Sequence, residues 1–237
     1  MAVYIYAITA DVHPVRLDGV TGVGDPPEEL ATLTEAGLSA IVSSVPEGLR
    51  ARRRDVMAHQ NVLQRLMADG AVLPLRFGMV ASEPQEIREA LKGHADFYRE
   101  RLRTLTGCAE YLLKATFDED FVLRQILQDS AEAQRLNEES RRHSGDPNIK
   151  IRLGELVAGE LRARNEAAAA EVLEALRPLA REIEENEPRG NDFASISFLV
   201  EDARHEDFVT AESELSERWG KGYQFRLHGP LPPYSFV

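Results

Sequence analysis

Hydrophobic and polar positions along the chain follow two periodicities, one typical of strands and the other of helices. Short stretches rich in β-branched and aromatic residues predict strands. These stretches cover residues 3–8, 38–45, 109–117, 193–200 and 223–228. Apolar residues spaced three or four positions apart predict helices between the strands. The predicted helices cover residues 55–68, about 82–105, 118–142, about 148–186 and 205–219.

The predicted strands fall into two groups, which are separated by a stretch with helical spacing alone. This order favours an α+β protein of two domains, each with an antiparallel sheet and helices packed on one of its faces. We expect an N-terminal domain over residues 1–117 and a C-terminal domain over residues 118–237. The helical segment, residues 118–188, is long enough to form a helical hairpin in the C-terminal domain.

Two apolar stretches occur where the local structure should be irregular. In residues 72–79, Pro74 lacks a backbone donor and Gly78 permits unusual backbone angles, which predicts an edge or bulged strand. The terminal residues 229–237 contain three prolines, which predict an extended segment without regular strand pairing. Because chain ends fray unless apolar groups anchor them, this tail either packs into the core of the protein or captures an apolar partner.

The sequence offers little catalytic or metal-binding chemistry. No two of the six histidines have the i, i+4 spacing of a helical zinc site, and His59 and His94 lie on apolar helical stripes. The single cysteine, Cys108, has no basic cluster nearby to favour its thiolate. We therefore predict no catalytic residue, no metal site and no cofactor. A ligand-binding or hydrolytic enzyme that uses His59 and Arg76 in a cleft between the domains stays open as an alternative.

Net charge and the length of apolar runs exclude some classes of binding partner. The formal net charge of −12 opposes general nucleic-acid binding, which depends on basic groups that neutralise phosphates. No apolar run approaches the roughly 18–20 residues that span a bilayer. One basic run, residues 50–54, fits either a solvated loop or a docking patch for an acidic partner. We expect a soluble, cytoplasmic protein without a membrane span.

Three motifs, taken in order, resemble the gas vesicle protein GvpL/GvpF family. The first is Tyr4-Ile-Tyr6, and the second is the helix with His59 and Leu63 followed by Leu73-Pro-Leu-Arg-Phe-Gly78. The third is the closing Gly229-Pro-Leu-Pro-Pro-Tyr-Ser-Phe236. Leu231 departs from the tryptophan that is usual there in the family. The resemblance covers nearly the whole chain, and it implies a ferredoxin-like N-terminal domain and a C-terminal α+β domain with a helical insertion.

The resemblance also implies a function and a partner. The family supplies accessory proteins for assembling gas vesicles, which are gas-filled buoyancy compartments with a protein shell. We therefore expect a non-enzymatic assembly factor, associated with gas vesicles, that binds the hydrophobic shell protein GvpA and other gas vesicle accessory proteins. A minor structural component of the vesicle wall is the further alternative.

The two irregular stretches are the predicted contact surface for the partner. An edge strand interrupted by proline leaves backbone groups available to an incoming strand, and aromatic residues are over-represented among interface hot spots. The predicted contact residues are Arg76, Phe77, Gly78, Pro232, Pro233, Tyr234 and Phe236.

Overall fold

The computed structural model describes residues 1–143, 146–220 and 222–237, and it divides into two compact units. Unit 1 comprises Met1–Tyr111, Leu199–Asp202 and Gly229–Val237, whereas unit 2 comprises Leu112–Phe198 and Ala203–His228. These units differ from the predicted division at residue 117, because the last residues of the chain belong with the N-terminal ones. The reason lies in Phe236, which is buried in the same hydrophobic cluster as Leu102 and Leu105.

Unit 1 contains a five-stranded antiparallel sheet with the order β2-β3-β1-β4, in which β5 also pairs with β1. The strands are β1 (Val3–Ala10), β2 (Ala31–Glu35), β3 (Leu38–Ser44), β4 (Leu73–Pro74) and β5 (Val80–Ala81). β4 pairs with Ala7 and Ile8, and β5 pairs with Val3 and Tyr4. The predicted edge strand around Pro74 is thus confirmed, because β4 ends the strand order.

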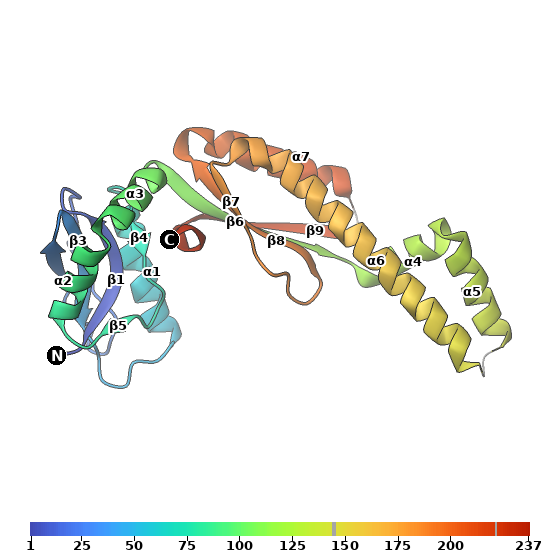
Figure 1. Ribbon diagram of the computed structural model, residues 1–237, viewed down its shortest axis with the longest axis horizontal. Coiled ribbons are helices and arrows are strands. Elements are labelled where there is room, and N and C mark those ends of the chain that lie inside the picture. The colour runs from blue at the N-terminus through green and yellow to red at the C-terminus, as the bar shows by residue number, and fades with distance from the viewer. Residues whose placement is uncertain (144–145, 221) are drawn as a thin grey trace. The chain divides into compact units, whose positions relative to one another are not determined.

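Helices cover both faces of this sheet (Figure 1). Helix α1 (Arg53–Met67) packs against Tyr4 and Tyr6, whereas α2 (Pro84–Gly93) and α3 (Ala95–Leu105) pack on the opposite face. The prediction of helices on one face only is therefore wrong for unit 1. Its physical reason is visible in β1 and β3, whose residues are buried almost continuously instead of at alternate positions, as in strands that are covered on both sides.

Two helices that were predicted as single are each divided in two. The predicted helix over residues 82–105 breaks at His94, whose backbone angles are not helical and which directly follows Gly93. The predicted helix over residues 118–142 breaks at Ser130. The Ser130 hydroxyl accepts a hydrogen bond from the amide of Ala133 and so caps the second helix, because serine competes well for the first free N–H groups.

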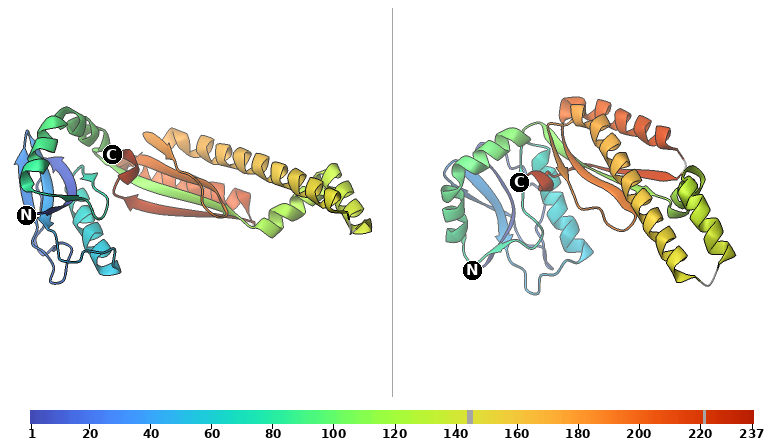
Figure 2. Two further views of the ribbon diagram at one scale, coloured as in Figure 1. Left: turned by 60° about the horizontal axis from the view of Figure 1, so that its bottom comes forward. Right: turned by 45° about the vertical axis from the view of Figure 1, so that its right-hand side comes forward.

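Unit 2 is built on most of a four-stranded antiparallel sheet with the order β7-β8-β6-β9. The strands are β6 (Cys108–Phe117), β7 (Glu182–Glu185), β8 (Asp192–Glu201) and β9 (Tyr223–Leu231). The helices are α4 (Glu119–Asp129), α5 (Ala131–Arg142), α6 (Pro147–Leu176) and α7 (His205–Trp219). Figures 1 and 2 show α6 and α7 side by side on one face of the sheet, with α5 alongside the first part of α6.

The helical segment predicted over residues 118–188 is corrected at its end. Helix α6 stops at Leu176, a 3₁₀ turn (Arg177–Leu179) contains Pro178, and Glu182–Glu185 form β7 instead of continuing the helix. Proline ends the helix because it has no amide hydrogen to donate to the preceding turn. The break predicted at residues 143–147 falls partly on residues 144–145, which lie outside the described residues.

Candidate functional site

The loop between β4 and β5 carries the first predicted contact residues. The amide of Leu75 donates to the carbonyl of Tyr6 at 2.8 Å, and the amide of Ile5 donates to the carbonyl of Met79 at 3.0 Å, so both ends of the loop are tied to β1. Gly78 has a φ of 89°, a left-handed conformation that glycine adopts without strain. Arg76 and Gly78 are exposed, whereas the Phe77 ring packs inward.

A buried network holds this loop from the inside. The Tyr4 hydroxyl lies 2.9 Å from Nδ1 of His59, and Nε2 of His59 lies 3.0 Å from the carbonyl oxygen of Leu75. The amide of Gly78 donates to the Tyr4 hydroxyl at 3.2 Å. Because the carbonyl can only accept, Nε2 carries the proton. Burial lowers the pKa of the imidazole and so favours the neutral form, in which Nδ1 accepts from the Tyr4 hydroxyl.

The enzyme alternative placed His59 in a cleft between the domains, whereas the structure buries it inside unit 1. Its side chain is 1% exposed, both ring nitrogens are occupied within unit 1, and its ring stacks on Tyr6 with centroids 5.5 Å apart. A general base must reach the proton that it abstracts, and this imidazole is covered. His59 instead positions the loop that carries Arg76.

The C-terminal tail, which carries the other predicted contact residues, is folded. The prediction of an extended, unpaired tail is wrong, because β9 continues to Leu231 and Tyr234–Phe236 form a 3₁₀ turn. The buried carboxylate of Glu110 accepts from the amide of Ser235 at 2.9 Å and from its hydroxyl at 2.8 Å. Nε of Arg101 donates to the carbonyl of Phe236 at 2.9 Å. These bonds fix the turn on unit 1.

The predicted tail residues differ in how accessible they are. Pro232, Pro233 and Phe236 are buried, and Phe236 forms part of the main hydrophobic cluster. Tyr234 is half-buried, and burial raises the pKa of its phenol to about 12. Among the described residues of the tail, Val237 has the most exposed large hydrophobic side chain, at 50%. Tyr234 and Val237 are thus the tail side chains that a partner could reach.

Residues of β4 and of the loop that follows it meet residues of the C-terminal tail at a cavity of about 380 Å³, which we call the edge cavity. All its lining residues belong to unit 1: they are Ile8, Leu73, Pro74, Leu75, Arg76, Met79, Phe97, Tyr98, Arg101, Tyr234 and Val237. The sequence had placed Arg76 and Tyr234 in one contact surface, and the structure brings both to this cavity. Predicted residues Phe77, Gly78, Pro232, Pro233 and Phe236 do not line it.

Sequence reasoning missed the contribution of α3 to the edge cavity. Phe97, Tyr98 and Arg101 line the cavity, but none of them was among the predicted contact residues. In the predicted helix over about residues 82–105, Tyr98 lies on the apolar stripe with His94, whereas Phe97 and Arg101 lie off it. Phe97 is 55% exposed, which is unusual for so large an apolar ring at a helix surface. The signal was present in the sequence, because Phe97 precedes Tyr98 and falls outside the apolar stripe.

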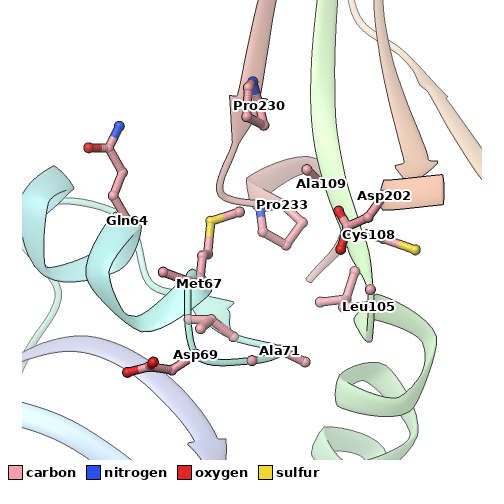
Figure 3. Close-up of a pocket in the computed structure, with 14 residues that line it drawn as sticks. Gln64, Met67, Asp69, Ala71, Leu105, Cys108, Ala109, Asp202, Pro230 and Pro233 are labelled. Atoms are coloured by element: carbon pink, nitrogen blue, oxygen red, sulfur yellow. The ribbon is translucent and has the colours of Figure 1, made fainter. Parts of the chain in front are cut away.

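A second cavity in unit 1, of about 570 Å³, lies between the end of α1 and the start of β6 (Figure 3). Asp69 and Asp202 line it, but Figure 3 shows the Asp69 carboxylate pointing away from Asp202 and Cys108. The two carboxylates therefore do not converge on a common ligand. Across the described residues, no group of three or more His, Cys, Asp or Glu side chains is arranged to hold a metal ion.

Comparison with known proteins identifies the family. A family model described as "Gas vesicle synthesis protein GvpL/GvpF" matches residues 2–237. The chain belongs to this family. Gas vesicle protein F of Streptomyces sp. (strain CB03234) is 40% identical to the chain over 238 residues, which cover 100% of both proteins. Gas vesicle protein L of the same strain is 27% identical over 256 residues, covering 99% of this chain and 92% of that protein.

Two solved structures share the GvpL/GvpF fold seen here. The crystal structure of GvpF from Anabaena sp. PCC7120 matches with a TM-score of 0.83 at 23% identity, covering 99% of this chain and 97% of that one. GvpF from Microcystis aeruginosa matches with a TM-score of 0.81 at 21% identity, covering 99% and 98%. At these identities the likeness concerns the fold, and it agrees with the predicted α+β class.

Membership of the GvpL/GvpF family confirms the resemblance drawn from the three motifs and assigns the chain a role in gas vesicle formation. The structure shows what two of the motifs do. Tyr4, His59 and Gly78 form one hydrogen-bonded network, although they come from distant parts of the sequence. No helix among the described residues is long and apolar enough to cross a membrane.

Proposed function

We propose that this GvpL/GvpF protein is a non-enzymatic assembly factor that binds the hydrophobic shell protein GvpA during vesicle formation. A strand-forming, aggregation-prone subunit needs its apolar faces and edges covered until it polymerises. A soluble protein with a net charge of −12 resists joining the growing shell indiscriminately. The identity of the client comes from the family, and the charge of this chain is compatible with that role.

The observation that carries the proposal is the distribution of exposed apolar side chains. The described residues include nine large hydrophobic side chains with substantial exposure, and only Ile151 and Val209 belong to unit 2. Of the rest, Met79, Phe97 and Val237 line the edge cavity, and Val80 directly follows Met79. Contiguous exposed apolar groups mark interaction sites more often than isolated ones do. The edge cavity is therefore the proposed docking surface for GvpA.

The experiment is co-expression of this chain with GvpA, followed by measurement of soluble GvpA and of its co-purification at low and high salt. We expect association in both conditions, because burial of apolar surface is little weakened by salt. Phe97→Ser should lower the recovery of GvpA without unfolding the protein, since the ring is exposed. Val209→Ser, the same apolar-to-serine change at an exposed position of unit 2, is the control. Absence of association at every salt concentration would refute the proposal.

The same protein could remain in the vesicle wall after assembly, as a minor structural component. Quantifying it in washed vesicles separates the two roles, because an assembly factor should be present in traces and a structural component in a fixed ratio to GvpA. We propose that it acts in the cytoplasm next to growing vesicles. Pull-downs against each other gas vesicle protein would define its further accessory partners.

A further inference from the structure

The edge cavity combines apolar walls with the guanidinium of Arg76, which is exposed on the loop between β4 and β5. Among the described residues, the structure gives this guanidinium no hydrogen-bond or ion-pair partner, although the Arg76 carbonyl accepts from the amide of Met79. The described residues that line the cavity include no aspartate or glutamate. This is notable in a chain with 40 acidic and 28 basic side chains. The charged side chains that line the cavity, Arg76 and Arg101, are therefore both basic, although acidic side chains outnumber basic ones in the chain.

The loop that presents Arg76 is held in one conformation before any partner arrives. On its inner side, His59 binds the carbonyl of Leu75, the hydroxyl of Tyr4 binds the amide of Gly78, and the Phe77 ring lies edge-on to His59 at 5.8 Å. Fixing the backbone beforehand lowers the entropy lost on binding. A guanidinium on such a loop favours a planar acceptor, because its donors match the two oxygens of a carboxylate.

The surface also continues beyond the cavity along the edge of the sheet. Met79 and Val80 are 43% and 41% exposed, and Val80 lies in β5, which pairs with β1 beside β4. If an extended segment of a partner lay along this edge, one of its side chains would enter the cavity and another would lie beside Arg76. Strand addition at an exposed edge uses this combination of backbone pairing and alternating side-chain pockets.

We infer that the edge cavity receives an extended segment of a partner protein that carries a large apolar side chain next to a carboxylate, with Arg76 binding the carboxylate. The inference deepens the proposed function and rests on it only for the identity of the client. The complementary charge of Arg76 and the length of the apolar edge favour a protein segment over an isolated small acid.

The test is selection of short random peptides displayed on phage against the full chain, followed by measurement of the affinity of the selected peptides. We expect enrichment of peptides with Asp or Glu beside a large apolar residue. Arg76→Gln should weaken their binding by about tenfold, because it removes the charged, planar pair of donors that would hold the carboxylate of the peptide. Arg76→Lys, which keeps the charge without the planar donors, should have an intermediate effect.

Arg53→Gln is the matched control, because Arg53 is also exposed in unit 1, its guanidinium has no partner among the described residues, and it does not line the cavity. Circular dichroism and thermal unfolding should show that both variants fold. The inference is overturned if the selected peptides lack acidic residues, if Arg76→Gln binds them as tightly as the parent, or if no peptide is enriched. Binding of decanoate alone, lost in Arg76→Gln, would also overturn it by identifying a fatty acid as the occupant.

Co-expression with GvpA separates this inference from the proposed function. If the Arg76→Gln protein recovers as much soluble GvpA as the parent, the carboxylate contact is wrong while the assembly role stands. If acidic–apolar peptides bind through Arg76 but the parent recovers no GvpA, the docking chemistry stands while the proposed client is wrong.

Discussion

The carboxylate of Glu110 accepts two hydrogen bonds from Ser235, one from its amide and one from its hydroxyl. Glu110 lies at the start of β6 and is only 4% exposed. A residue near the middle of the chain thus fixes the position of the 3₁₀ turn Tyr234–Phe236. A buried carboxylate is tolerated because both of its oxygens are bonded. The same contact places Tyr234 and Val237 at the edge cavity.

Removing the Ser235 hydroxyl should destabilise the protein. Ser235→Ala deletes one hydrogen bond to a buried charge, and we expect the free energy of unfolding to fall by about 1.5–3 kcal/mol. Glu110→Ala should have a larger effect, because it leaves the Ser235 amide without its acceptor. Urea denaturation measures both changes. Ser44→Ala, at an exposed serine in the same unit, is the control and should change stability by less than about 0.5 kcal/mol.

Phe236 should contribute more to stability than its neighbour Val237. Phe236→Ala removes a ring that is 6% exposed and should cost about 3–5 kcal/mol, the usual range for a buried aromatic side chain. Val237→Ala should leave the unfolding midpoint nearly unchanged, because half of that side chain is exposed. If the two variants melted at the same temperature, the assignment of Phe236 to the core would be wrong. Deletion of residues 230–237 should accordingly destabilise the protein.

Acid should weaken the fold through His59. In the folded protein, burial holds the pKa of the His59 imidazole below its ordinary value of 6.5. As the pH falls, His59 therefore takes up a proton in the unfolded chain before it does so in the folded protein. The contribution of His59 is therefore complete above about pH 6.5 and is lost as the pH falls from there toward the lowered pKa. In that interval the free energy of unfolding should fall by up to about 1.4 kcal/mol per pH unit.

His59→Gln tests this assignment by urea denaturation at several pH values. The variant should be less stable than the parent by about 2 kcal/mol at pH 8, because Tyr4 and Leu75 lose a buried partner. Its stability should depend less steeply on pH below 6.5. Parallel pH dependences in the two proteins would assign the acid sensitivity to another group.

Glu212 should be a site where replacement stabilises the protein. It lies on α7 with 9% exposure, and burial raises the pKa of its carboxyl. A raised pKa means that Glu212 contributes most stability below pH 4.5 and less as the pH rises through the folded pKa. Glu212→Met replaces the buried carboxyl by an apolar side chain, and we expect a gain of about 1 kcal/mol at pH 7. The gain should shrink at pH 4, which thermal unfolding at both pH values would reveal.

The sequence pattern predicted the helices and strands that are rich in apolar residues. It failed for a strand whose conformation depends on hydrogen bonding to a neighbouring strand. β1 was predicted because aromatic and β-branched residues fill it. β7 was missed because Glu182-Ile-Glu-Glu185 has the composition of a polar helix, and its strand conformation comes from pairing with β8. Such pairing is non-local, so a window of sequence along the chain does not contain it.

The candidate site was predictable only in part, for a similar reason. Pro74 and Gly78 showed that one segment would be irregular, and the aromatic tail stood out by its composition. That Arg76 and Tyr234 would line one cavity together with Phe97 depends on Glu110, Arg101 and their bonds to the tail. A glutamate and an arginine in amphipathic elements usually face solvent, so nothing in their local sequence predicts these contacts.

The division of unit 1 between the two ends of the chain has a consequence for synthesis on the ribosome. Residues 229–237 are translated after the whole of unit 2, so the edge cavity acquires Tyr234 and Val237 last. Domains that are continuous in sequence can complete their folding while synthesis goes on, whereas this unit has to wait. During synthesis, therefore, the edge cavity lacks two of its lining residues until the whole of unit 2 has been translated.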